Sequence, residues 1–125
     1  MAGGEAALRR LLDGAPETTG VIAYNDLMAI GAMRGIRASG RTVPGDISVV
    51  GFDDVAIAGY TDPPLTTVAQ AIGELGRWAV ERLVERLAES GLARDDGGRD
   101  RTPVGTVLPV RLVVRGSSGP PPGSG

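Results

Sequence analysis

Residues 20–54 read GVIAYNDLMAIGAMRGIRASGRTVPGDISVVGFDD, and this stretch decides the fold class. It contains two continuous apolar runs of strand length, residues 20–24 and residues 47–52, and each run ends in polar residues. Between them, apolar residues recur at helical spacing until Gly40, a residue type that commonly follows a helix end. Two strands joined by a helix predict a right-handed βαβ unit in a parallel sheet, with the first strand buried on both faces.

The sequence on either side extends this unit. A short helix is expected over residues 5–12, and a long amphipathic helix over residues 71–90, after the segment LTTVAQ. A polar loop over residues 91–101 then leads to one or two further strands, in which Pro109 marks a break or a sheet edge. The predicted fold is therefore α/β, a parallel sheet with flanking helices.

Length and composition favour one domain with little affinity for nucleic acid. The chain has 125 residues, 42% of them hydrophobic, which is enough for one modest core. Its formal net charge of −2 provides no general attraction for a phosphate backbone. We expect residues 1–115 to form the domain. Residues 116–125 contain only Gly, Ser and Pro, and they are predicted to be a disordered tail.

The composition also argues against most enzyme classes. The chain has no histidine and no cysteine, which excludes thiol nucleophiles, Ser-His triads and the usual zinc sites, so no metal and no cofactor are predicted. Asp53 and Asp54 could act as acid and base or bind Mg²⁺. Adjacent residues at a strand end point in different directions, so we expect no matched carboxylate pair and no enzyme. No stretch resembles a signal peptide or a membrane span, which predicts a cytoplasmic protein that does not contact membranes.

Polar residues follow both central strands at the sheet edge where ligands of parallel α/β proteins bind. These are Tyr24-Asn25-Asp26 after the first strand and Phe52-Asp53-Asp54 after the second. Amide and carboxylate groups together suit a ligand dense in hydroxyl or ring N–H groups. The sequence therefore predicts a sugar or nucleobase-like ligand at this edge.

Structural roles compete with ligand binding at several of these positions. Asp26 stands where a helix N-cap is expected, so its predicted role is structural. One of the two following acids, Asp53 or Asp54, could simply turn the chain after its strand. Phe52 could pack in the core, and Gln70 could be an ordinary surface residue.

Four segments in a fixed order carry a family resemblance. Residues 21–54, PPLTTVAQ, GRWAVERLVERL and LVVRGS together resemble LacI/GalR-family bacterial transcription regulators, from Thr19 to Ser117. Such regulators join a helix-turn-helix domain to a two-lobed effector domain shaped like a periplasmic sugar-binding protein of type I. Effector binding shifts their dimer between states of different operator affinity. The resemblance implies that this chain is the C-terminal part of the effector-binding domain, a partial lobe without the DNA-binding domain.

The resemblance also implies roles for individual residues. Asn25 would hydrogen-bond the effector, Asp53 would accept bonds from effector hydroxyl or ring groups, and Phe52 would wall the pocket. Gln70 would reach in from the crossover between the lobes. The residues implied at a dimer interface are Ile30, Met33, Ile57 and Tyr60, although core packing is the alternative for the first two.

The expected partners follow from this reading. They are a small-molecule effector and a second copy of the chain, with DNA contacted only through a domain absent from these residues. A sugar-binding protein of a transport system and a truncated remnant without function of its own are the alternatives. The missing export signal and the LTTV and LVVRGS segments argue against the transport protein.

Overall fold

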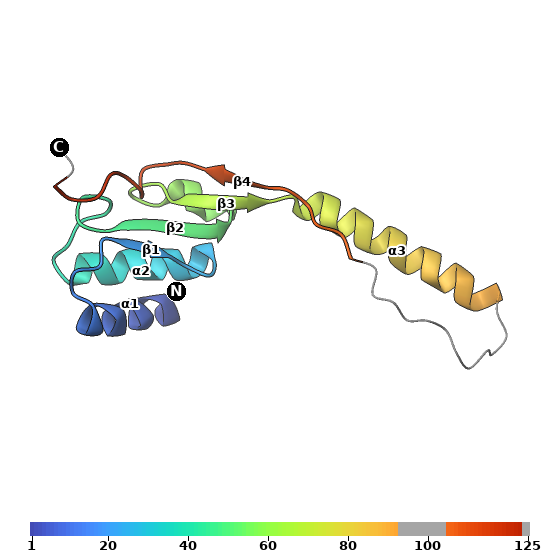
Figure 1. Ribbon diagram of the computed structural model, residues 1–125, viewed down its shortest axis with the longest axis horizontal. Helices are drawn as coiled ribbons and strands as arrows, with labels where there is room; N and C mark the ends of the chain where they lie inside the picture. Colours follow the sequence, from blue (N-terminus) through green and yellow to red (C-terminus); the bar gives the residue numbers. More distant parts are fainter. Residues whose placement is uncertain (93–104, 124–125) are drawn as a thin grey trace. The chain divides into compact units, whose positions relative to one another are not determined.

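The computed structural model describes residues 1–92 and 105–123, in which four strands form one sheet with the order β1-β2-β3-β4 (Figure 1). β1, β2 and β3 are parallel, and β4 runs antiparallel to β3. The elements are α1 (Ala2–Gly14), β1 (Gly20–Ile22), α2 (Asp26–Ala38), β2 (Ser48–Asp53), the 3-10 helix η1 (Ala56–Tyr60), β3 (Thr66–Gln70), α3 (Ile72–Leu92) and β4 (Val110–Val113).

The chain divides into two compact units. One contains Met1–Gln70 and Val110–Gly125, and the other contains Ala71–Pro109. The second unit holds α3, which confirms the predicted long helix. Several apolar side chains of this helix are exposed, among them Leu83 at 58% and Leu87 at 62%. The predicted loop over 91–101 lies, from residue 93 on, outside the described residues.

The core of the first unit lies where α2 packs against β2 and α1 packs against α2 (Figure 1). The buried face of α2 follows helical spacing, which places Ala29, Met33 and Ile36 on one side. α1 approaches α2 closely at Gly4, where the absence of a side chain is required because a Cβ would overlap the carbonyl of Met28. The full set of buried apolar residues is Leu8, Ala29, Ala32, Met33, Ile36, Ile47, Val49, Ala58 and Leu65.

β1 differs from its prediction. The strand extends over only three residues and pairs with β2 alone, which makes it an edge of the described sheet. The expectation that it is buried on both faces is wrong, because Ile22 is 83% exposed. Val21 packs against the core cluster, so one face is covered and the other is open.

The C-terminal segment is ordered at its start, so the predicted disorder is wrong for residues 116–119. Ser117 is fully buried, and its carbonyl oxygen accepts from the Val49 N–H at 2.7 Å. Its hydroxyl donates to the Val49 carbonyl at 2.6 Å and accepts from the Thr66 N–H at 2.8 Å. Ser117 thus extends the hydrogen bonding at the start of β2 and β3.

The rest of the C-terminal region matches the predicted pattern in part. One strand, β4, forms directly after Pro109, as expected for a break position, and residues 105–109 are not in a strand. Within the described part of the chain, no helix is both long and apolar enough to cross a lipid bilayer.

Candidate functional site

The predicted site lies where β1 and β2 end side by side. The two strands are parallel, with Ile22 opposite Val50, and the pairing continues through a bond of 2.8 Å from the Ala23 N–H to the Val50 carbonyl. Asn25 follows β1 and Asp53 ends β2, so both occur at the carboxyl edge of the sheet. This is the edge at which open α/β sheets bind ligands.

Asn25 is the N-cap of α2. Its backbone is extended, with φ of −152°, and its Oδ1 accepts from the Met28 N–H at 2.8 Å. The expectation that Asp26 supplies this cap is therefore wrong, because Asp26 is already the first helical residue. Within the described residues, the Nδ2 of Asn25 makes no hydrogen bond. This group remains available as a donor.

Asp26 has a structural role, as predicted, but through other contacts. Its side chain is fully buried and accepts one hydrogen bond from the Thr67 hydroxyl and another from the Val55 N–H at 2.8 Å. Gly51 makes room for the carboxylate, since a Cβ there would overlap Asp26 Oδ1. Asp26 thus links the start of α2 to β3 and to the turn after β2.

The turn after β2 has an uncommon backbone conformation. Asp53 has φ of 112° and Asp54 has φ of 55°, and such positive values cost a residue other than glycine roughly 1 to 3 kcal/mol each. The two carboxylates have different partners. Asp53 Oδ1 accepts from Gln70 Nε2 at 2.6 Å, and Asp54 Oδ1 pairs with Arg115 Nη2 at 2.6 Å. This arrangement does not support their use as a matched acid and base.

Arg115 is a residue of this region that the sequence analysis missed. Besides Asp54, its guanidinium donates through Nη1 to the Leu65 carbonyl at 2.8 Å, and its backbone N–H donates to Thr66 Oγ1 at 2.9 Å. The sequence signal was an arginine at the end of the LVVR run. Its significance depends on β4 pairing with β3, which brings residue 115 to the start of β3.

The four predicted effector residues are only partly brought together. Asp53 and Gln70 are joined by a hydrogen bond, and both are half-buried. Phe52 is also half-buried, opposite Val68 in the sheet. Among the described residues, no hydrogen bond connects Asn25 to the Asp53 and Gln70 pair. No group of three or more acidic residues there could hold a metal ion.

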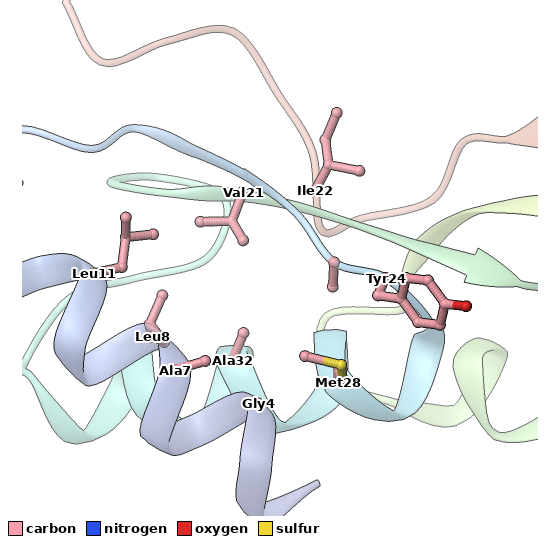
Figure 2. A pocket seen from close by; sticks show the side chains of 10 residues that line it. Gly4, Ala7, Leu8, Leu11, Val21, Ile22, Tyr24, Met28 and Ala32 are labelled. Carbon is pink, nitrogen blue, oxygen red and sulfur yellow. The ribbon is translucent and has the colours of Figure 1, made fainter.

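An apolar hollow lies elsewhere, between α1 and β1. It has a volume of about 150 Å³, and Figure 2 shows the side chains of α1 and β1 that border it. None of the predicted effector residues lines it, and neither does any carboxylate, so it does not match the polar site predicted from the sequence. Its lining residues are Gly4, Ala7, Leu8, Leu11, Val21, Ile22, Ala23, Tyr24, Met28 and Ala32.

The residues predicted at a dimer interface differ in exposure. Tyr60 is 88% exposed and Ile57 is 46% exposed, so both can meet a partner. Ile30 is half-buried and packs against the core cluster. Met33 is only 3% exposed, which favours the core role that was left open for it over an interface role.

Comparisons with known proteins agree with this architecture. Residues 1–118 match the family described as periplasmic binding protein-like domain. The helix-turn-helix transcriptional regulator CelR of Thermobifida fusca is 43% identical over 114 residues, which cover 91% of this chain and 31% of CelR. The chain therefore spans about a third of that relative's length, and the matching relatives are transcriptional regulators rather than enzymes.

Solved structures give the same result. A CelR transcriptional regulator in complex with cellobiose superposes with a TM-score of 0.78 at 43% identity, covering 92% of this chain and 32% of that one. The lac repressor dimer bound to operator and an anti-inducer superposes with a TM-score of 0.74 at 35% identity, covering 94% of this chain and 37% of that one. This chain belongs to the periplasmic binding protein-like family, and it corresponds to part of the effector-binding region of LacI-family transcriptional regulators.

Proposed function

We propose that this chain senses a sugar effector and contributes to the dimer of a LacI-family transcriptional regulator. The observation that carries the proposal is the hydrogen bond of 2.6 Å between Asp53 and Gln70 at the carboxyl edge of the sheet. It holds a carboxylate and an amide together on neighbouring strands, where family resemblance and fold both predict effector contacts.

The hydrogen-bonding groups at this edge suit a sugar. Within the described residues, Asp53 Oδ2 makes no hydrogen bond and can accept from a hydroxyl, while Asn25 Nδ2 can donate to one. A sugar hydroxyl both donates and accepts, so one ring could use both groups. The cellobiose bound to a CelR regulator, at 43% identity, supports a sugar over a nucleobase.

We propose that dimerisation uses the exposed side chains of Ile57 and Tyr60, with Ile30 beside the core. The lac repressor, solved as a dimer on its operator, supports this assembly. DNA contact is assigned to a helix-turn-helix domain outside these 125 residues, because this segment has a net charge of −2. The complete regulator would act in the cytoplasm.

Thermal unfolding of the purified chain tests both parts. At several protein concentrations, the midpoint should rise with concentration if a dimer is the folded form. Cellobiose, lactose, ribose or adenine is then added. Binding of at least one of the sugars should stabilise the native state by about 2.7 kcal/mol at a hundredfold excess over Kd, and this raises the midpoint.

The variant Asp53→Asn should lose the response to sugar, because a neutral amide cannot accept as a carboxylate does. Asp13→Asn, which changes an exposed acid on α1, is the matched control and should respond like the wild type. A wild type indifferent to all three sugars, or an Asp53→Asn variant that still responds, would show that the effector proposal is wrong.

A further inference from the structure

The turn formed by Asp53, Asp54 and Val55 is held from two sides by residues far away in the sequence. We propose that Arg115 is a positioning residue of this turn, whose guanidinium holds Asp54 and thereby directs the Asp53 carboxylate to Gln70. The inference rests on the proposed function, since the carboxylate that Arg115 positions is the one assigned to the effector.

The backbone of the turn requires such support. Two consecutive residues other than glycine have positive φ, 112° at Asp53 and 55° at Asp54. This conformation persists only where surrounding contacts compensate for its cost. The φ and ψ angles of a residue also set the direction of its side chain, so relaxation of Asp54 would move the Asp53 carboxylate relative to Gln70.

Arg115 supplies contacts of the kind that this turn needs. One guanidinium nitrogen meets Asp54 Oδ1 at 2.6 Å, and the other donates to the Leu65 carbonyl at 2.8 Å. The planar fork of an arginine can hold two acceptors at once. The side chains of Arg115 and Asp54 are only 23% and 24% exposed, so water screens the pair less than at an open surface.

The opposite side of the turn is fixed by the core. Asp26 is fully buried and accepts from the Val55 N–H at 2.8 Å, one residue after Asp54. The turn is therefore clamped between a buried carboxylate and a half-buried arginine. Only the Arg115 side can be loosened without disturbing the core, so this residue is the better one to test.

Nuclear magnetic resonance of the ¹⁵N-labelled full chain tests the positioning without any ligand. In Arg115→Met, we expect the backbone resonances of Asp53 and Asp54 and the side-chain amide of Gln70 to shift. Arg115→Lys, which keeps the charge but not the fork, should shift them less. Asp54→Asn removes the same ion pair from its other end and should reproduce the Met variant, which keeps the test valid if that variant does not fold.

Ser117→Ala is the matched control. It loosens the same C-terminal segment by removing the buried hydroxyl between Val49 and Thr66, but it does not touch the turn. We expect it to lower the unfolding midpoint and to leave the Asp53, Asp54 and Gln70 resonances in place. Equal shifts in Ser117→Ala and Arg115→Met, or no shift in Arg115→Met, would overturn the proposal.

Titration with cellobiose, lactose and ribose separates this proposal from the proposed function. For a sugar that the wild type binds, Arg115→Met should weaken affinity roughly tenfold, the effect of one charged hydrogen bond, and Ser117→Ala less than twofold. Unchanged affinity in Arg115→Met would overturn the positioning role and leave sugar sensing intact. If the wild type binds none of the three while the resonances shift as expected, the effector assignment fails and the positioning of Asp53 stands.

Discussion

The two turns that follow β1 and β2 start from similar sequences and are held in different ways. Tyr24-Asn25-Asp26 and Phe52-Asp53-Asp54 each place an aromatic residue before two polar ones at the carboxyl end of a parallel strand. Asn25 has an ordinary extended backbone and is bonded to a residue three positions later. The turn at Asp53 has positive φ and is held by two contacts between distant parts of the sequence. Asp26 and Val55 are 29 positions apart, and Arg115 and Asp54 are 61 positions apart.

The difference shows where each turn obtains its stability. The first turn is stabilised by the helix that it begins, so it forms with local structure. The second turn is held by tertiary contacts, because Asp26 reaches it from α2 and Arg115 from the segment after β4. The proposed effector carboxylate of Asp53 thus lies on the turn that is held by tertiary contacts.

The largest expected effect comes from Asp26, because this residue is part of the first turn and its carboxylate also holds the second. Asp26→Ala leaves the Val55 N–H and the buried Thr67 hydroxyl without their acceptor. We expect the free energy of unfolding to fall by about 3 kcal/mol, the range for buried polar groups left unpaired. Urea unfolding followed by circular dichroism measures this loss.

Asp26→Asn is the control for that variant. The amide keeps the shape of the side chain and one acceptor oxygen, so about half of the loss is expected. If both variants were as stable as the wild type, the hydrogen bonds of Asp26 would contribute little, and the second turn would not depend on the core for its shape.

A smaller effect is expected at Asn25, where the turn is local. Asn25→Ala removes the cap on the Met28 N–H and should cost about 1 kcal/mol, whereas Asn25→Asp should retain the cap. The same urea experiment compares them. Asn25→Asp also loses the Nδ2 donor and should bind an effector sugar more weakly at unchanged stability. Equal destabilisation by alanine and aspartate would contradict the cap.

The βαβ unit could be predicted from sequence because its signals are local. The two apolar runs and the helical spacing between them fixed β1, α2 and β2 within a few residues, and Gly40 does follow the helix with φ of 79°. Periodicity reports which side of a segment is apolar, not what covers it. For this reason the exposure of Ile22 on the edge strand could not be predicted.

The contacts that shape the site were harder to predict because they join distant segments. Arg115 and Ser117 acquire their roles only when β4 pairs with β3, and composition alone indicated a disordered tail after residue 115. At the start of α2, Asn and Asp are almost equally good caps. The Asp26 carboxylate lies in buried space beside Gly51, and that space is a property of the assembled fold.

A third turn with an acidic residue lies before β2, and the smallest change in stability is expected there. Asp46 Oδ2 accepts from the Thr42 hydroxyl and from the Thr42 N–H, both at 2.7 Å. These bonds span four positions in the sequence, and the bond between Asn25 and Met28 spans three. The Thr42 hydroxyl, with the Thr42 N–H and the nearby Arg41 charge, lowers the pKa of Asp46 below its ordinary value of 3.8. Because Asp46 is exposed, solvent screens the interaction and its contribution is small.

The sign of this shift fixes the pH dependence. A carboxyl group whose pKa is lower in the folded state stabilises the fold above the unfolded value, and the stabilisation is lost as pH falls through the folded one. Asp46→Asn should therefore have a slightly lower urea midpoint than the wild type at pH 7, and the difference should shrink as the pH falls below 3.8. A loss at Asp46 as large as that at Asp26 would mean that the number of hydrogen bonds, and not their burial, determines how firmly each turn is held.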